Sequence, residues 1–348
     1  MHILNYKPDD LKDKLTKICD KPFQVNQILQ WIYLHHKIDF NEMTNLSLAL
    51  RGRLLNELDS KLPEIIDIKN SSDKSIKFLL KLHDNNYIES VNIPSLKKNT
   101  LCISTQAGCA RNCAFCATAK QGLKRNLTVD ELLSQYIITS NHISPERITN
   151  IVLMGMGEPL DNFETVIDFL KILWANNGFD FSGRKTTVST CGVVPMIDKL
   201  TELRLKFKLA VSLSSAIDEK RNILMPINKI YPLKELKRSL LSFSKKSSFR
   251  ITFQYVMIDD FNMGKEDITA LKKFCGDISC KINLIKWNAV SPVAAISGCQ
   301  LNTFKSPSND KIERFINDLK SLPVAITYRA SKGTDISGAC GQLTGGIV

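Results

Sequence analysis

Histidine is scarce in this chain, with five residues among 348, at positions 2, 35, 36, 83 and 142. Their positions suggest neither a histidine metal centre nor a hydrolase site. Long apolar runs are also missing, since no stretch approaches about 18 residues, and the N-terminus lacks the charged-then-apolar layout of a signal peptide. We therefore expect a cytoplasmic protein that makes no membrane contact.

Acidic residues are outnumbered, because 35 Asp and Glu face 47 Lys and Arg and leave a net charge of +12. This excess favours a polyanionic partner. Residues 201–250 hold 12 basic and 4 acidic side chains, whereas residues 1–100 hold 15 and 13. The segment 201–250 is therefore a candidate phosphate-facing surface, and a solvated basic helix face is the alternative interpretation.

The first hundred residues divide into a helical part and a strand-rich part. Apolar residues at helical spacing, such as Val25, Ile28 and Ile32, predict a small helical N-terminal accessory domain over residues 1–60. Residues 61–98 predict a linker and a β-hairpin, whose strands are expected at Ile76–Leu82 and Tyr87–Ile93. The sequence thus predicts two appendages in front of a larger domain.

Residues 99–330 alternate apolar runs with amphipathic stretches, which predicts an α/β fold with a parallel sheet. Six strands are expected, at Leu101–Thr105, Ile148–Met154, Lys185–Thr190, Phe207–Leu213, Arg250–Ile258 and Lys281–Ile285. Helices are expected around 129–142, 162–176, 233–244, 265–274 and 308–321. We expect a partial (β/α)6 barrel of the TIM type, with chemistry at the carboxyl ends of the strands. Residues 331–348, rich in glycine and small side chains, predict a mobile tail.

Three of the ten cysteines lie within eight residues, at Cys109, Cys113 and Cys116, on the loop after the first predicted barrel strand. In a chain without an export signal, cysteines favour thiol or metal chemistry over a disulfide framework. Three thiolates can converge on one soft metal centre, and a cluster with three protein ligands keeps one iron open. Zinc completed by a distant ligand, or unligated thiols, are the alternatives.

Two further features point to a ligand site. The run Gly155-Met-Gly157-Glu158-Pro159 follows an apolar strand, so the glycines allow close backbone approach and Glu158 can pair with an ammonium group. Strand alternation places Glu89 on the apolar face of its strand, where partial burial would suit the carboxylate to proton abstraction. A salt bridge between Glu89 and a lysine is the alternative.

The spacing of the cysteine motif, with an aromatic residue before its last cysteine, resembles the radical S-adenosylmethionine (SAM) superfamily. Further motifs narrow the resemblance to the RlmN family of RNA methyltransferases. They are Thr100–Gly108, Ala117–Gly122, Arg125–Thr128 and Ala339–Leu343. The resemblance extends from about Pro22 to Leu343, nearly the whole chain.

The resemblance implies a site for two cofactors. A [4Fe-4S] cluster would be held by Cys109, Cys113 and Cys116, and its open iron would chelate SAM, of which two are used per turnover. The SAM-binding positions carried over by motif are Gly157, Glu158, Ser189, Ser212, Leu213, Ser214 and Asn288. Ser214 departs from the pattern, since relatives commonly carry histidine there.

The resemblance also implies a substrate and a mechanism. The substrate would be C2 of an adenine in the peptidyl transferase centre of 23S rRNA, before ribosome assembly is complete, and an adenine of tRNA. Cys340 would carry the methyl group and form a covalent intermediate with RNA, and Glu89 would accept the C2 proton. Cys102 would resolve the intermediate as a Cys102–Cys340 disulfide. An electron donor such as flavodoxin or ferredoxin would feed the cluster, and we expect a monomer.

Two alternatives remain open. A Cfr-type enzyme would methylate C8 of the same adenine, although Pro159 and the run Ala119–Gly122 favour the RlmN pattern. A zinc-stabilised, non-enzymatic RNA-binding protein would explain the charge and the cysteine cluster but not Cys340. The other cysteines, at positions 19, 191, 275, 280 and 299, match no motif and are interpreted as structural or incidental.

Overall fold

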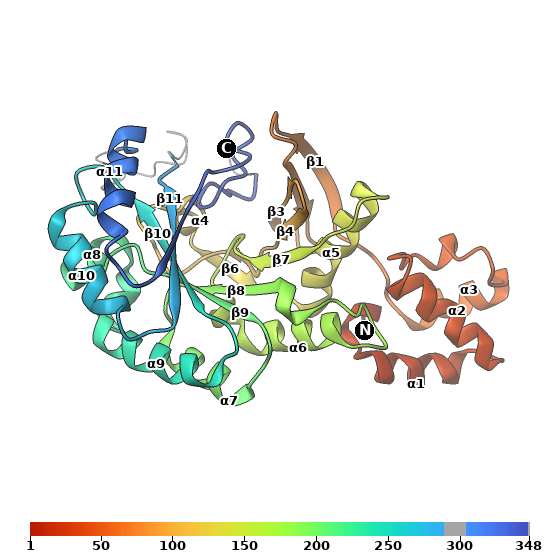
Figure 1. Ribbon diagram of the computed structural model, residues 1–348. Helices are drawn as coiled ribbons and strands as arrows, with labels where there is room; N and C mark the ends of the chain where they lie inside the picture. The colour runs from red at the N-terminus through yellow and green to blue at the C-terminus, as the bar shows by residue number, and fades with distance from the viewer. Residues whose placement is uncertain (289–303, 347–348) are drawn as a thin grey trace.

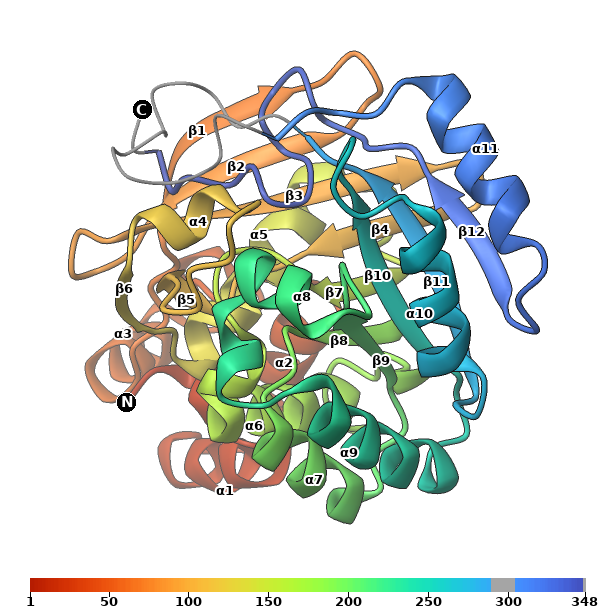
Figure 2. The same cartoon turned by 90° about the vertical axis from the view of Figure 1, so that its left-hand side faces the viewer.

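The computed structural model describes residues 1–288 and 304–346 (Figure 1). All predicted site residues lie within these ranges, whereas Cys299 and the last two residues of the predicted tail lie outside them. A group of helices at the N-terminus adjoins one large curved sheet, whose outer side is covered by helices (Figures 1 and 2). In the described part of the chain, no helix is long and apolar enough to span a membrane.

The N-terminal part is helical, as the apolar spacing predicts. Its elements are η1 (Ile3–Asn5), α1 (Pro8–Ile18), α2 (Pro22–Tyr33), η2 (Phe40–Glu42) and α3 (Leu48–Glu57). Pro8 and Pro22 occupy the first turns of their helices, where a missing N–H costs no hydrogen bond. Val25, Ile28 and Ile32 are buried in the hydrophobic core.

Ten strands form the main sheet in the order β1-β2-β3-β4-β7-β8-β9-β10-β11-β12. Their bounds are β1 (Glu64–Asn70), β2 (Ile76–Lys81), β3 (Tyr87–Ser95), β4 (Lys98–Cys102), β7 (Asn150–Leu153), β8 (Thr186–Thr190), β9 (Lys208–Ser212), β10 (Ile251–Met257), β11 (Cys280–Lys286) and β12 (Ala325–Arg329). From β4 to β12 all neighbouring strands are parallel. The sheet ends at β1 and β12, so the barrel is open, which confirms the predicted partial barrel (Figure 2).

The sheet is larger than predicted at both ends. The predicted hairpin is part of an antiparallel extension, because β1 pairs with β2 and β3 pairs with β4. Sequence reasoning missed β1 because this edge strand is mostly exposed and lacks clean alternation. At the other end, β12 adds a seventh parallel strand. Sequence reasoning missed this strand as well, because it is largely exposed.

Helices fill the connections between the parallel strands. They are α5 (Val129–Ile143), α6 (Phe163–Trp174), α7 (Val194–Leu203), α8 (Asp218–Leu224), α9 (Leu233–Lys246), α10 (Lys265–Cys275) and α11 (Asn309–Leu319), with η3 (Pro159–Asn162), η4 (Gly183–Lys185) and η5 (Pro226–Lys229). All five predicted helices are present, and α7 and α8 are additional. The carboxyl ends of the strands are therefore free to form a site.

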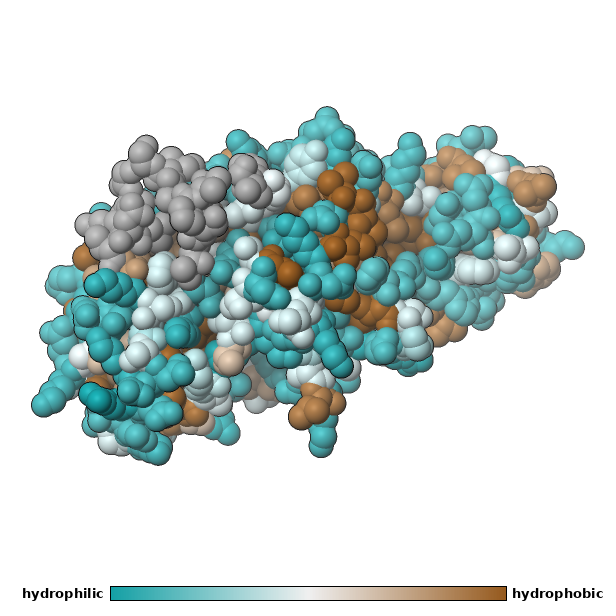
Figure 3. All heavy atoms as spheres, turned by 90° about the horizontal axis from the view of Figure 1, so that it is seen from above, coloured by the Kyte–Doolittle hydropathy of each residue, from teal (hydrophilic) through white to brown (hydrophobic). Residues whose placement is uncertain are grey.

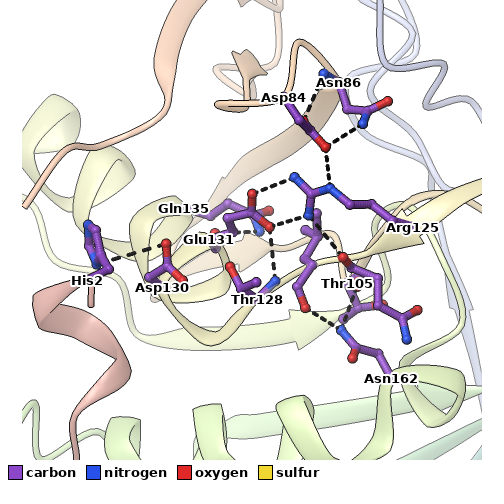
Figure 4. A network of polar contacts seen from close by, with 12 residues as sticks. His2, Asp84, Asn86, Thr105, Arg125, Thr128, Asp130, Glu131, Gln135 and Asn162 are labelled. Carbon is purple, nitrogen blue, oxygen red and sulfur yellow. Dashed lines mark hydrogen bonds and ion pairs between the residues drawn. The ribbon is translucent and has the colours of Figure 1, made fainter. Parts of the chain in front are cut away.

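A small second sheet, β5 (Gln106–Gly108) with β6 (Leu123–Asn126), frames the cysteine loop and the short helix α4 (Ala117–Lys120). Arg125 of β6 lies between Asp84 of the β2–β3 turn and Glu131 of α5 (Figure 4). Its Nη1 and Nη2 donate to both Glu131 oxygens, at 2.8 and 2.7 Å. This bidentate pair joins the turn, the small sheet and the barrel into one support for the loop.

The basic side chains of segment 201–250 are spread over several elements. Five of the twelve belong to α9, at the lower edge of the molecule in Figure 1. Lys237 is ion-paired with Asp277 and Arg238 with Asp198. Two of these side chains are thus paired on the helix surface, and a phosphate-facing surface on this segment stays a prediction.

The face seen from above is uneven in polarity (Figure 3). Apolar surface gathers beside the N-terminal helices. The edge strand β1 exposes Ile65 and Ile66. Polar side chains cover most of the remaining visible surface.

Candidate active site

One cavity opens at the carboxyl ends of the parallel strands, where barrel chemistry is expected. Nine of the predicted site residues line it: Cys109, Cys113, Cys116, Gly157, Glu158, Ser189, Ser212, Asn288 and Cys340. They come from the cysteine loop, four strand ends and the tail, so the fold gathers residues spread over more than 230 positions of sequence. The cavity is the candidate active site.

The cysteine loop is fixed where it leaves β5. Gly108 has φ +79°, and a Cβ at this position would collide with the carbonyl oxygen of Gly122. The N–H of Cys109 donates to that oxygen at 2.9 Å, and the N–H of Ala114 donates to Leu224 of α8 at 2.9 Å. The loop therefore requires glycine at its start and is bound to two neighbouring elements.

The three thiols share one cavity wall, and burial raises the pKa of Cys109 to about 12. Burial also raises the pKa of Cys113, to which the nearby Cys116 and Cys109 add. As placed in residues 1–288 and 304–346, no group of three or more His, Cys, Asp or Glu side chains is arranged to hold a metal ion. The donor set nevertheless fits a soft iron–sulfur centre, because a positively charged cluster would favour the thiolates that burial disfavours.

A buried glutamine holds the glycine-rich motif in place. Gly157 has φ +96°, and a Cβ there would lie 2.5 Å from the side chain of Gln106. The Oε1 atom of Gln106 accepts a 2.8 Å hydrogen bond from the N–H of Glu158. Sequence reasoning missed Gln106, whose position in β5 gives no sign of this contact.

Glu158 is buried at the cavity wall, and its carboxylate is held by the backbone. Oε1 accepts from the N–H of Leu160 at 3.0 Å, and Oε2 accepts from the N–H of Cys191 at 2.7 Å. Burial raises the pKa of Glu158, although these hydrogen bonds act to lower it. The side chains of Thr190 and Cys191 also form hydrogen bonds with this carboxylate, and the binding of an ammonium group by Glu158 stays a prediction.

The remaining predicted SAM-binding residues divide into two sets. Ser189 and Ser212 at the ends of β8 and β9, and Asn288 after β11, line the cavity. Leu213 and Ser214 are fully buried behind this wall. Ser214 has φ +53°, and its Oγ has no hydrogen-bond partner in the described structure. For Leu213 and Ser214 a direct contact with SAM stays a prediction.

Arg221 of α8 is a buried cation that sequence reasoning missed. Only 1% of its surface is exposed, and burial lowers its pKa. It donates to the carbonyls of Cys191 at 2.7 Å and of Leu213 and Ser212 at 3.2 Å, and to Asn228 Oδ1 at 2.8 Å. One guanidinium thus joins the ends of β8 and β9 behind the cysteine loop.

Cys340 lies on the partition between the large cavity and a smaller one that Cys102 lines. Cys340 is exposed, whereas Cys102 is 6% exposed and burial raises its pKa to about 12. The structure brings the two thiols to one cavity although 237 residues separate them in the chain. Arg329, at the end of β12, lines both cavities and was not predicted, because β12 itself was missed.

Glu89 lies outside both cavity walls. It is 2% exposed, and its Oε1 lies 2.8 Å from the ammonium nitrogen of Lys77. Its Oε2 accepts hydrogen bonds from the N–H groups of Thr344 at 2.7 Å and Gly345 at 3.1 Å. The lysine salt bridge, which was the alternative interpretation, is therefore present, and it is joined to the tail.

The predicted tail is docked in this structure. Gly341 accepts from the N–H of Ala117 at 2.7 Å, and Leu343 accepts from Thr118 Oγ1 at 2.8 Å. At its start, the N–H of Gly333 donates to Asp73 Oδ2 at 2.8 Å. These contacts join the tail to both the cysteine loop and the antiparallel strands; that it moves stays a prediction.

Comparison with known proteins places the whole chain. Residues 103–273 match the radical SAM superfamily, and residues 1–59 match the ribosomal RNA large subunit methyltransferase N-terminal domain. A probable dual-specificity RNA methyltransferase RlmN from Clostridium botulinum (strain Eklund 17B / Type B) is 40% identical over 343 residues, 98% of this chain and 96% of that protein. The chain belongs to the RlmN family.

Other members agree with this assignment. A protein of the same name from Clostridium perfringens (strain SM101 / Type A) is 39% identical and covers 98% of this chain and 96% of that protein. The crystal structure of a radical SAM methyltransferase from Sphaerobacter thermophilus is 34% identical, covers 99% of both chains and superposes with a TM-score of 0.92. The predicted fold and the predicted class, a radical SAM RNA methyltransferase, are confirmed.

Proposed function

We propose that this RlmN family member methylates C2 of adenine 2503 in 23S rRNA, and one adenine of tRNA, through an S-methylcysteine at Cys340. The observation that carries the proposal is the position of Cys340 on the partition between the cavity of the three thiols and the cavity of Cys102. The names of the curated relatives describe dual-specificity RNA methyltransferases, and the matched N-terminal domain is that of a ribosomal RNA large subunit methyltransferase, which supports RNA as the substrate.

The cofactors and the side chains of the proposed site have different roles. When bound, a [4Fe-4S] cluster and two SAM molecules per turnover supply the methyl group and the radical that removes a hydrogen atom from it. Cys109, Cys113 and Cys116 hold the cluster. Glu158 and the polar residues Ser189, Ser212 and Asn288 bind SAM at the strand ends.

Three residues of the chain act on the RNA. Cys340 receives the methyl group and becomes bonded to adenine C2 through the resulting methylene carbon. Glu89 accepts the C2 proton. The Cys102 thiolate then attacks the sulfur of Cys340 and the sulfur–carbon bond breaks. Its electron pair passes to the methylene carbon, which takes up a proton to become the methyl group of the released RNA, and a Cys102–Cys340 disulfide remains for later reduction.

The same proposal includes the remaining partners. An electron donor such as flavodoxin or ferredoxin would supply the electron that the bound cluster requires, and the enzyme acts as a cytoplasmic monomer on 23S rRNA that is not yet assembled into ribosomes.

The test is an anaerobic assay of the reconstituted protein with SAM, reductant and protein-free 23S rRNA or tRNA, followed by mass spectrometry of the nucleosides. The proposal predicts 2-methyladenosine from both RNAs and none from Cys340→Ala. 8-Methyladenosine would instead support the Cfr-type reaction. Bound zinc without iron, together with no SAM cleavage, would support the non-enzymatic alternative.

A further inference from the structure

Lys77 lies at the junction of two features of the proposed mechanism, the base and the tail that carries Cys340. Its side chain is buried in β2, with 6% of the residue exposed. The ammonium nitrogen lies 2.8 Å from Glu89 Oε1 and donates to the carbonyl oxygen of Ser337 at 3.3 Å. One buried cation therefore contacts both the carboxylate and the segment that precedes Cys340.

Strand register explains why these groups meet. Glu89 is opposite Leu79, and Lys77 is opposite Val91, so Lys77 and Glu89 are diagonal neighbours on one face of β2 and β3. Val91 is in turn opposite Cys102 of β4. The lysine, the glutamate and the resolving thiol thus share one face of the sheet.

The tail covers this same face. A Cβ at Gly346 would lie 2.9 Å from the side chain of Leu79, and a Cβ at Gly345 would lie 2.9 Å from the carbonyl oxygen of Tyr87. Figure 2 shows the C-terminal segment between the antiparallel strands and α4. Here Glu89 Oε2 is occupied by the N–H groups of Thr344 and Gly345.

We propose that Lys77 is a positioning residue that, with Glu89, holds the tail so that Cys340 faces the thiol cavity, and that Glu89 Oε2 becomes free to accept a proton when the tail lifts. The inference rests on the proposed function, because it assigns the freed oxygen to the C2 proton. It explains why a buried base is bound by the segment that carries the methyl group. When the tail is docked, Cys340 faces the cavity. When the tail lifts, Glu89 becomes accessible to RNA.

Three variants separate this role from general support of the fold. Lys77→Met removes the cation and keeps most of the side-chain volume, and Lys77→Arg keeps the charge. Lys81→Met is the matched control, because Lys81 is on the same strand and face and forms no ion pair within the described residues. Thr344→Pro removes one N–H donor to Glu89 without changing the buried ion pair.

The first measurement is amide hydrogen exchange of residues 333–346 in the reconstituted holoprotein without RNA. Loss of hydrogen bonds to a charged group predicts exchange at least about tenfold faster in Lys77→Met and Thr344→Pro. Lys77→Arg and Lys81→Met should exchange like the wild type. Unchanged exchange in Lys77→Met and Thr344→Pro would overturn the proposal. This measurement does not depend on RNA methylation.

The second measurement compares Cys340 S-methylation with SAM alone against methylation of RNA. Lys77→Met should slow S-methylation at least about tenfold, in step with the faster exchange, and Lys77→Arg should restore it. If exchange rises but S-methylation keeps its wild-type rate, Lys77 has only a structural role. If S-methylation and exchange behave as expected while RNA gains no methyl group, the positioning of Cys340 stands and the proposed RNA reaction fails.

Discussion

The carbonyl oxygen of Gly341 accepts a 2.7 Å hydrogen bond from the N–H of Ala117. These residues directly follow Cys340 and Cys116, so one backbone hydrogen bond joins the proposed methyl carrier to the proposed cluster loop. Gly341 has φ +83°, and a Cβ there would lie 3.0 Å from the carbonyl oxygen of Phe115. The contact therefore depends on glycine.

Replacing Gly341 by alanine should loosen the docked tail. The left-handed backbone and the close carbonyl should cost about 1–2 kcal/mol, which increases the undocked population roughly 5- to 30-fold. Trypsin cleavage after Lys332 should accelerate by the same factor if cleavage follows the open population. Gly52→Ala is the control, because α3 leaves open space around Gly52, and it should stabilise the helix by about 0.5–1 kcal/mol without changing tail cleavage. Equal cleavage of wild type and Gly341→Ala would refute this role of the contact.

Alkylation of the two proposed active thiols should differ strongly with pH. Burial raises the pKa of Cys102 from 9.0 to about 12, which lowers its thiolate fraction at pH 8 roughly a thousandfold. With reduced protein and iodoacetamide, peptide mass spectrometry should find the exposed Cys340 modified first and Cys102 only after unfolding or at much higher pH. Because burial raises the folded-state pKa of Cys102 above its unfolded value, the stability that the buried neutral thiol contributes is intact below pH 9. This stability is lost as the pH rises toward 12. Similar rates for both thiols at pH 8 would contradict the buried position of Cys102.

Removing the Arg221 side chain should destabilise the protein strongly. Arg221→Met removes the donor to the carbonyl groups of Cys191 and Ser212 and to Asn228 Oδ1, so urea unfolding should show a loss of roughly 3 kcal/mol or more. Arg221→Lys should not restore stability, since a single ammonium cannot reproduce the planar set of donors. Arg238→Met is the control, because its ion pair with Asp198 is mostly exposed and should contribute at most about 1 kcal/mol. A similar loss in both variants would show that Arg221 is not a special support of the site.

The sequence predicted the barrel and the cysteine loop from local patterns, whereas the SAM-binding positions were carried over from the family resemblance. Apolar runs set the six expected strands, and polar or cysteine residues at their carboxyl ends become neighbours in any parallel sheet. Cys109 could be placed in this way, whereas Ser189 was assigned from the family resemblance. Cys191, two residues after Ser189, could have been found by the same rule, since it directly follows β8 and lines the cavity.

The missed features depend on long-range contacts that leave no periodic pattern. Lys77 lies in no sequence pattern that signals burial, and in the structure its ammonium group donates to the carbonyl oxygen of Ser337 in the tail. Arg221 lies in a short polar helix, and its burial follows from how α8 packs behind two strand ends. Edge strands such as β12 face solvent and show only weak alternation of apolar and polar residues. Because no strand was predicted there, the position of Arg329 could not be predicted either.

The proposal for Glu89 predicts a trapped intermediate. With the proton acceptor replaced in Glu89→Gln, the C2 proton of the adduct has no base, so the protein should accumulate covalently bound to RNA. Denaturing gel electrophoresis after incubation with SAM, reductant and RNA measures this species. Lys81→Met should turn over without accumulating it. Undiminished release of methylated RNA by Glu89→Gln would remove Glu89 from the mechanism.

The covalent link between Cys340 and adenine is the central claim, and Cys102→Ala tests it most directly. Without the resolving thiol the adduct cannot be released, so nuclease and protease digestion followed by tandem mass spectrometry should find adenosine joined through one methylene carbon to Cys340. The account predicts this linkage at Cys340 and at no other cysteine. Normal yields of methylated RNA from Cys102→Ala, with no adduct on Cys340, would contradict it.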